Sequence, residues 1–315
     1  MRTKICDMLR IKYPIIQGAM VWVATAELVS AVSNAGGLGI ISPLTDRGLE
    51  GEIKKTKKLT KNPFGVNLPI LSPNAEEIVE EIIEEDVPVV TASVGDPKRF
   101  TPRLKKEEIT VIQVVTNARH AKSAEKAGVD AVITMGFEAG GHVGGDEITT
   151  FTLVPSIVDA VKIPVIAAGG IADARGFLAA LMLGAQGVQI GTRFIATEAC
   201  IAHKNFKNAI IDAREDSTTV IGKGVFPARA IKNTFSAWFE GLKEEERTMQ
   251  AMFDTDKARS ALIDGDIENG AVWCGQDAGM IREIKKVKDV IDEMVIDVVE
   301  IVGNRRFSYA PRRKS

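Results

Sequence analysis

The sequence is poor in the residues that mark disulfide-rich and metal-binding proteins. Its 315 residues include only three cysteines, Cys6, Cys200 and Cys274, and aromatic residues make up 5% of the chain. The cysteines are odd in number, far apart and without the short spacings of a metal-ligand motif. We therefore expect no metal site and a reduced, cytoplasmic protein.

Long apolar runs and an excess of one charge are also missing. No stretch of about twenty apolar residues occurs, which argues against a membrane span. An acidic residue, Asp7, lies where a signal peptide would need apolar residues. The formal net charge of −2 argues against a nucleic-acid-binding protein, which normally carries a basic excess.

Short apolar runs alternate with amphipathic segments through the first two thirds of the chain. Eight runs read as strands, at 14–19, 38–42, 64–68, 87–92, 110–115, 131–135, 164–168 and 187–190. Helical patterns lie between them, among others at 24–34, 74–85, 117–127, 153–161 and 173–183. Eight strand–helix units with strands buried on both faces predict an α/β fold, a closed (β/α)8 TIM barrel.

The pattern changes near residue 212, where charged helical stretches replace the strands. We expect a mainly helical insertion over 212–272 that covers the substrate. Residues 1–211 and 273–315 then form the barrel, with a closing amphipathic helix at 285–302. The basic tail after residue 304 has the composition of a solvated chain end.

A glycine-rich loop with a histidine follows the sixth predicted strand. Residues 136–145 contain five glycines around His142. Glycine lets the backbone approach a bound group closely, and imidazole suits proton transfer beside a cofactor. A lone histidine is more often structural, but its place between glycines favours catalysis. His120 reads as a surface residue, and His203 as a helix cap or a docking residue.

Two further loops have the composition of a phosphate site. Gly169-Gly170 follows the seventh predicted strand and Gly191-Thr192 the eighth, and each opens into a helix. Free backbone N–H groups and the helix dipole favour an anion there. Each loop alone could be a tight turn or a helix cap. Together, after strands seven and eight, they predict a phosphate-bearing cofactor. Neither matches the dinucleotide or P-loop motif.

These motifs resemble the FMN barrel family that joins nitronate monooxygenases (2-nitropropane dioxygenases) and enoyl-acyl-carrier-protein reductase II. The most specific stretches are 138–142, 163–173 and 188–194. The resemblance implies a flavoprotein oxidoreductase with FMN as cofactor. It implies FMN contacts for Ala19, Met20, Asn67, Glu138, Gly141, Gly169, Gly170, Gln189, Gly191, Thr192 and Gln276.

Three stretches, 149–154, 205–207 and 229–233, resemble the reductase branch more closely. That branch implies reduction of trans-2-enoyl-acyl-carrier-protein with NADH or NADPH in fatty-acid synthesis, with His142 as a general acid of near-neutral pKa. One alternative is a nitronate monooxygenase that oxidises alkyl nitronates with O2. Another is a non-catalytic flavin-binding barrel, because one fold serves many functions. Glu138 could contact the ribityl chain or an ion, or be a solvated acid.

The partners follow from the branch. Acyl carrier protein is acidic, so the reductase reading predicts a basic rim at the site. The candidates are Lys204, Lys207, Arg214, Lys223, Arg229 and Lys232, although an ordinary solvated face is the alternative. The resemblance alone suggests a homodimer, and it leaves open a requirement for a monovalent cation.

Overall fold

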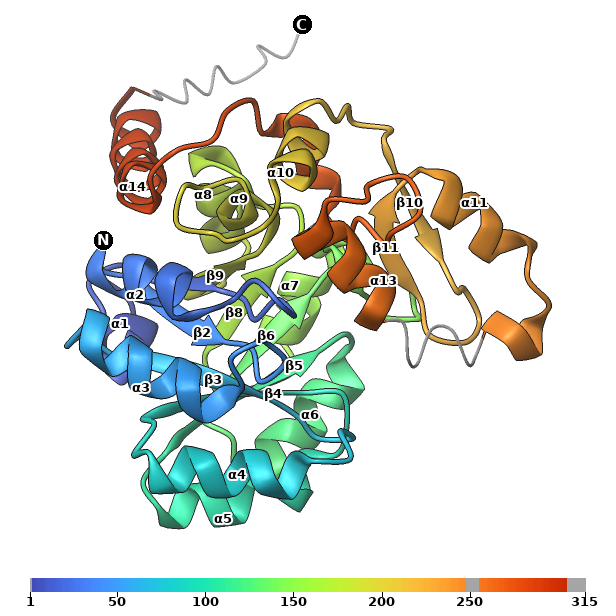
Figure 1. Ribbon diagram of the computed structural model, residues 1–315. Helices are drawn as coiled ribbons and strands as arrows, with labels where there is room; N and C mark the ends of the chain where they lie inside the picture. The colour runs from blue at the N-terminus through green and yellow to red at the C-terminus, as the bar shows by residue number, and fades with distance from the viewer. Residues whose placement is uncertain (1, 248–254, 305–315) are drawn as a thin grey trace, which may run out of the picture.

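The computed structural model describes residues 2–247 and 255–304 and contains a closed barrel of eight parallel strands (Figure 1). Strand β1 pairs with both β2 and β9, which closes the ring. The predicted (β/α)8 barrel is confirmed, and each of its strands lies within a predicted apolar run or within a residue or two of one. In chain order the barrel strands are β1 (Ile15–Gln17), β2 (Leu38–Ile41), β3 (Phe64–Pro69), β4 (Val89–Ser93), β5 (Thr110–Val115), β6 (Ala131–Met135), β8 (Val165–Ala168) and β9 (Gly187–Ile190).

Helices surround the barrel, and capping side chains set where several of them begin. Asn117 and Asp173 cap α6 and α8, each accepting a hydrogen bond from a backbone N–H in the first turn. The helices of the barrel are α1 (Lys4–Leu9), α2 (Ala26–Asn34), α3 (Leu49–Leu59), α4 (Ala75–Glu84), the 3-10 turn η1 (Pro97–Arg99), α5 (Thr101–Lys106), α6 (Ala118–Lys126), α7 (Thr150–Val158), α8 (Ala174–Met182), α9 (Thr192–Ile195) and α10 (Lys204–Ile211).

The barrel interior is a packed core that is closed at its amino-terminal end by α1. Ile5 and Leu9 of α1 pack with Ile16, Ile40 and inward-facing residues of the other strands, all buried. The interior of a barrel of eight strands is just wide enough for side chains to fill it. This core leaves the opposite end, where the strands finish, for the functional site.

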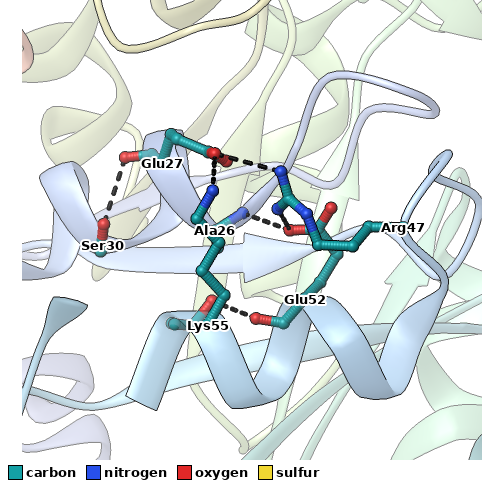
Figure 2. Close-up of polar contacts among 7 residues, drawn as sticks. Ala26, Glu27, Ser30, Arg47, Glu52 and Lys55 are labelled. Atoms are coloured by element: carbon teal, nitrogen blue, oxygen red, sulfur yellow. Dashed lines mark hydrogen bonds and ion pairs between the residues drawn. The ribbon is translucent and has the colours of Figure 1, made fainter. Parts of the chain in front are cut away.

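A buried carboxylate holds α2 and α3 together (Figure 2). Glu52 of α3 has no exposed surface, and its Oε2 accepts hydrogen bonds from the backbone N–H of Ala26 at 2.7 Å and from Arg47 at 2.8 Å. Arg47 also bonds Glu27 at 3.2 Å, and Lys55 pairs with the same Glu27 oxygen. A negative charge at a helix N-terminus is stabilising, so Glu52 fixes the start of α2 beside the loop after β1.

The segment 212–272 contains a β-hairpin as well as helices, which the fading strand pattern did not predict. Strands β10 (Thr218–Ile221) and β11 (Ala228–Ile231) pair antiparallel, and β11 also pairs with β7 (Gly141–His142). Beside them lie α11 (Thr234–Gly241), α13 (Thr255–Arg259) and the π-helical turn η2 (Ser260–Asp264). The strands have four residues each and mix polar with apolar side chains, so periodicity does not reveal them.

The chain returns to the barrel after the insertion. The 3-10 turn η3 (Gln276–Met280) precedes the closing helix α14 (Val287–Asn304), which packs against α8 and α2. Figure 1 shows α14 on the side of the barrel away from α11 and the hairpin. Within the described ranges, no helix combines the length and apolar character that a membrane crossing requires. The basic tail lies outside the described residues.

Candidate active site

A cavity of about 830 Å³ opens at the carboxyl ends of the barrel strands. Loops after β1, β3, β4, β5, β6, β8 and β9 line it, and residues 225–227 of the insertion and Trp273, Cys274 and Asp277 of the closing segment complete its wall. Ten of the twelve predicted site residues lie on this wall, namely Ala19, Met20, Asn67, Gly141, His142, Gly169, Gly170, Gln189, Gly191 and Thr192. The structure therefore brings together residues that are up to 173 positions apart in the chain (19 to 192).

The histidine loop is fixed by close contacts at its glycines. A Cβ at Gly136 would lie 2.0 Å from Oγ1 of Thr150, and one at Gly140 would lie 2.5 Å from the carbonyl carbon of Cys274. A Cβ at Gly144 would meet Thr116 at 2.6 Å. These contacts are too short for any side chain, so glycine is required at these three positions. The loop thereby packs on α7, on the closing segment and on the end of β5.

His142 sits on β7 with its ring against two aromatic side chains. Its centroid lies 4.2 Å from that of Phe226 in the insertion and 5.2 Å from that of Trp273. Burial lowers the pKa of His142 to about 4, and a hydrogen bond with the Pro227 backbone opposes this only in part. The imidazole is therefore neutral at pH 7, whereas the sequence suggested a pKa near neutrality.

The two predicted phosphate loops lie next to each other on the cavity wall. Gly169 and Gly170 have φ of +100° and +74°, the left-handed region that favours glycine. Strands β8 and β9, which carry the two loops, are neighbours in the barrel. Among the described residues, the backbone N–H groups of Gly170 and Gly191 have no protein acceptor. Adjacent free N–H groups at loop ends form an anion-binding concavity.

Comparison with known proteins gives the family of this chain. The family model for nitronate monooxygenase matches residues 2–297. The chain belongs to the nitronate monooxygenase family. It is 35% identical to a probable nitronate monooxygenase of Staphylococcus haemolyticus, over 93% of this chain and 97% of the relative. It is 33% identical to (3aS,4S,5R,7aS)-5-hydroxy-7a-methyl-1-oxo-octahydro-1H-indene-4-carboxyl-CoA dehydrogenase of Rhodococcus jostii, over 95% and 96%.

Solved structures resemble the fold over nearly its whole length. FabK from Thermotoga maritima matches with a TM-score of 0.91 and 43% identity, over 96% of this chain and 98% of FabK. A nitroalkane oxidase from Streptomyces ansochromogenes matches with a TM-score of 0.80 and 27% identity, over 95% and 99%. This chain is thus an FMN-dependent oxidoreductase of the nitronate monooxygenase family. The non-catalytic alternative is thereby set aside.

The cavity suits the flavin cofactor of the family. Its volume of about 830 Å³ lies within the range of small-molecule and cofactor sites. Within the described part of the chain, three buried polar atoms beside it have no protein partner: Gln113 Oε1, His142 Nδ1 and Trp273 Nε1. A planar ligand with donors and acceptors on its edge can satisfy such groups. The two glycine loops offer the N–H groups that a phosphate needs.

Polar side chains at the ends of β3, β4 and β9 form another part of the wall. Asn67 exchanges hydrogen bonds with Ser93 and accepts one from Thr91 at 3.1 Å. Gln189 packs so closely on the loop after β1 that a Cβ at Gly18 would lie 3.1 Å from its side chain. Asn67 and Gln189 are therefore held in place by neighbouring strands.

Two predicted contact residues are not on the cavity wall. Glu138 turns its carboxylate to Thr150 at the start of α7, accepting from the backbone N–H at 2.8 Å and from the hydroxyl at 2.9 Å. It thus caps the helix, which begins three residues earlier than the expected 153. The side chain of Gln276 is exposed, while its backbone N–H donates to the carbonyl of Glu138 at 2.9 Å.

Phe226, Trp273 and Asp277 are among the wall residues that sequence analysis missed. Asp277 is 5% exposed, and burial raises its pKa to about 7, although a hydrogen bond with Thr192 and the charge of Arg193 oppose the shift. The glycine at position 275 is the only local signal for this segment. A Cβ there would lie 2.2 Å from Oδ1 of Asp277.

The predicted basic rim contains two residues that are not at the surface. Arg229 is 4% exposed, and Lys207 donates from its buried Nζ to the carbonyls of Thr197 and Cys200 at 2.7 and 2.6 Å. Both cations make hydrogen bonds inside the protein. We therefore no longer count them among the residues that could bind acyl carrier protein. His203 caps α10 by accepting from the backbone N–H of Asn205.

Proposed function

We propose that this chain reduces the carbon–carbon double bond of trans-2-enoyl thioesters carried by acyl carrier protein, with NADH or NADPH as the electron donor. The observation that carries the proposal is the likeness to FabK, an enoyl-acyl-carrier-protein reductase II, at 43% identity and a TM-score of 0.91. The nitroalkane oxidase is less similar on both measures. The octahydroindene-carboxyl-CoA dehydrogenase relative also bears the name of an enzyme that acts on a thioester.

The cofactor is held by the wall residues that the resemblance identified. We assign the phosphate to the loops of Gly170 and Gly191, and the polar edge of the ring system to the region of Asn67, Gln189 and Gln113. When bound, FMN would supply the hydride chemistry that links the nicotinamide to the β-carbon of the substrate. Glu138 contributes indirectly, because it caps α7 beneath the histidine loop.

His142 acts as a hydrogen-bond donor. A ring with a pKa of about 4 has no second proton to give at pH 7. In the tautomer that carries the proton on Nδ1, the ring nitrogen without a protein partner, its single N–H can donate to the thioester carbonyl oxygen, where negative charge develops as the β-carbon gains a hydride. A neutral histidine acting in this way can stabilise an enolate. The α-carbon then takes its proton from water, which balances the reaction.

The insertion and the closing segment together supply the apolar cover. Phe226 and Trp273 flank the His142 ring and keep water from it, which strengthens a hydrogen bond made there. We propose that 212–272 is the substrate-covering unit and that 1–211 and 273–315 form the cofactor-binding barrel. For docking of the carrier protein we retain the exposed cations Lys204, Arg214, Lys223 and Lys232.

Nitronate oxidation is the second candidate, and the neutral state of His142 favours it. A neutral imidazole is a base, and it could accept a proton from, or orient, a nitroalkane-derived substrate. The family model is also that of nitronate monooxygenase. Both reactions would take place in the same cavity. They differ in the electron acceptor, which is an enoyl thioester in one and oxygen in the other.

Two anaerobic flavin experiments separate the two. In one, the reduced, FMN-loaded protein is mixed with crotonyl thioester and the return of flavin absorbance is followed; in the other, the oxidised protein is mixed with propyl-2-nitronate and the loss of flavin absorbance is followed. We expect the thioester to reoxidise the flavin faster than the nitronate reduces it, and His142→Ala to slow the reoxidation by about 10²–10⁴-fold without loss of bound FMN. Faster reduction of the oxidised flavin by the nitronate rejects the reductase assignment. His203→Asn, which keeps a helix cap at a residue that does not line the cavity, is the matched control.

A further inference from the structure

Arg229 is a buried cation that joins the insertion to the histidine loop. It projects from β11, is 4% exposed, and donates from Nε and Nη2 to the carbonyl oxygen of Phe137 at 3.1 and 2.8 Å. Its Nη1 donates to Oγ1 of Thr218 on β10 at 3.1 Å. The guanidinium also lies 5.1 Å from the centre of the Phe137 ring. A buried cation is costly unless its donors are satisfied, and here three hydrogen bonds satisfy them.

The same strand holds the other side of His142. In the antiparallel ladder, Ala228 of β11 is opposite His142 and Arg229 is opposite Gly141. Just beyond, the backbone N–H of Val143 donates to the carbonyl of Pro227 at 3.0 Å. His142 therefore lies within one attachment to this strand, the ladder at 141–143, and a second attachment, the guanidinium fork, holds Phe137 five residues earlier.

The loop between these attachments has little conformational preference of its own. Gly136, Gly140 and Gly141 allow backbone angles that other residues avoid, and Gly141 has a φ of +70°. External bonds must then set the position of the ring. The backbone N–H of Phe137 donates to the carbonyl of Ile148 at 2.9 Å. The backbone N–H and the carbonyl of Phe137 are therefore both hydrogen-bonded.

We propose that Arg229 is a positioning residue for His142: by fixing Phe137 to the hairpin, it sets the place of the imidazole in the cavity. The inference rests on the proposed role of His142. It also gives the insertion a second task, because the hairpin then builds the site as well as covering it. A lysine cannot replace the guanidinium, since it lacks the planar fork that reaches Phe137 and Thr218 together.

Variants of the FMN-loaded protein test this. Turnover is measured with whichever substrate pair the protein converts faster, crotonyl thioester with NADH or NADPH, or propyl-2-nitronate with oxygen, so a wrong substrate assignment does not affect the result. We expect Arg229→Lys to lower kcat by about 10- to 100-fold, because a small misplacement of a catalytic group costs this much, while KM and the Kd for FMN stay within about twofold.

The double variant decides whether Arg229 acts through His142. We expect His142→Ala/Arg229→Lys to be no slower than His142→Ala alone, because residues that act as a unit are not additive. A further loss equal to that of Arg229→Lys in the wild-type background overturns the proposal. So does an unchanged kcat in the single variant, or a kcat loss accompanied by loss of FMN.

Two further variants separate positioning from general stability. Thr218→Ala leaves both hydrogen bonds to Phe137 in place and should keep kcat within about threefold of wild type. A loss as large as that of Arg229→Lys would assign the effect to the hairpin as a whole and reject the fork. Arg99→Lys is the matched control, because Arg99 also lies over a phenylalanine, Phe100, at 4.5 Å and donates to a backbone carbonyl, that of Ile70, at 3.1 Å.

Discussion

The carboxylate of Glu138 accepts hydrogen bonds from both the backbone N–H and the hydroxyl of Thr150, at 2.8 and 2.9 Å. The pair joins the histidine loop to the first turn of α7, so one contact both caps the helix and supports the loop. The resemblance implies that Glu138 contacts FMN. In the structure its carboxylate bonds the first turn of α7.

Replacing Glu138 by Gln should lower the free energy of unfolding by about 1 kcal/mol, because the cap loses its charge and one acceptor. Urea unfolding at pH 7 measures this. Glu147→Gln is the control, since Glu147 is a partly exposed carboxylate on the same loop, paired with Lys223 at 2.9 Å, and such pairs contribute little. Equal effects of the two variants would contradict the capping role.

The glycines of the histidine loop give a second test. Gly140→Ala places a Cβ 2.5 Å from the Cys274 backbone, whereas one at Gly145 meets nothing within 4 Å. We expect Gly140→Ala to destabilise the protein by about 1–3 kcal/mol and to weaken FMN binding, and Gly145→Ala to change neither appreciably. Thermal unfolding and flavin-fluorescence titration provide the measurements. Tolerance of alanine at Gly140 would refute the close approach.

The pH dependence of catalysis follows from the ionisation of His142. Because burial lowers its pKa to about 4, the ring stays neutral from about pH 5 upward. We expect kcat to be level between about pH 5.5 and 9 and to change only at lower pH, as the imidazole takes up a proton. A kcat profile with a midpoint near 6.5 that disappears in His142→Gln would show an ordinary, titrating imidazole instead.

The same shift predicts how stability changes with pH. Between pH 6.5 and about 4 the unfolded chain binds a proton at His142 that the folded chain does not bind. This contribution therefore destabilises the fold progressively as the pH falls through that window. Subtracting the urea stability curve of His142→Gln from that of wild type isolates it, and a difference independent of pH would contradict the lowered pKa.

We expect ionisation of Asp277 to weaken FMN binding as the pH rises. Its pKa is raised to about 7, so the folded protein keeps a proton there that the unfolded chain loses from pH 3.8 upward. Above pH 7 the ionised carboxylate lies beside Thr192 and repels a bound phosphate. We expect the Kd for FMN to increase between pH 7 and 8.5, by at most about tenfold per unit, and Asp277→Asn to remove this dependence.

The control for this prediction is Asp297→Asn, an exposed residue of α14 away from the cavity. It should keep the wild-type dependence of FMN affinity on pH. If Asp277→Asn also keeps that dependence, then Asp277 does not face the phosphate, and the position of the phosphate beside Thr192 must be reassigned.

The barrel could be predicted from the sequence because its strands are buried on both faces and read as continuous apolar runs. The glycine loops were also visible, since their composition is local. Helix starts were less predictable: α7 begins at Thr150 because Glu138, twelve residues earlier, caps it, and Glu52 contacts the start of α2 from a different helix. Such partners leave no periodic pattern.

The rest of the site depends on contacts between distant segments. Phe226 and Trp273 reach His142 from 84 and 131 residues along the chain, and no local motif marks either (226 − 142; 273 − 142). Arg229 had the composition of a basic surface, yet strand pairing with β7 buries it against Phe137. The sequence shows that residue 229 carries a positive charge. It does not show that the guanidinium donates to the carbonyl of Phe137.

The central claim is that the adjacent loops at Gly169-Gly170 and Gly191-Thr192 hold a phosphate while His142 lies against the ring system. Titration of the flavin-free protein with FMN and with riboflavin tests it most directly, because the two differ only in the phosphate. Two charge-assisted hydrogen bonds of about 1.5–3 kcal/mol each predict that FMN binds at least about 100-fold more tightly. Equal affinity for the two flavins would contradict the account.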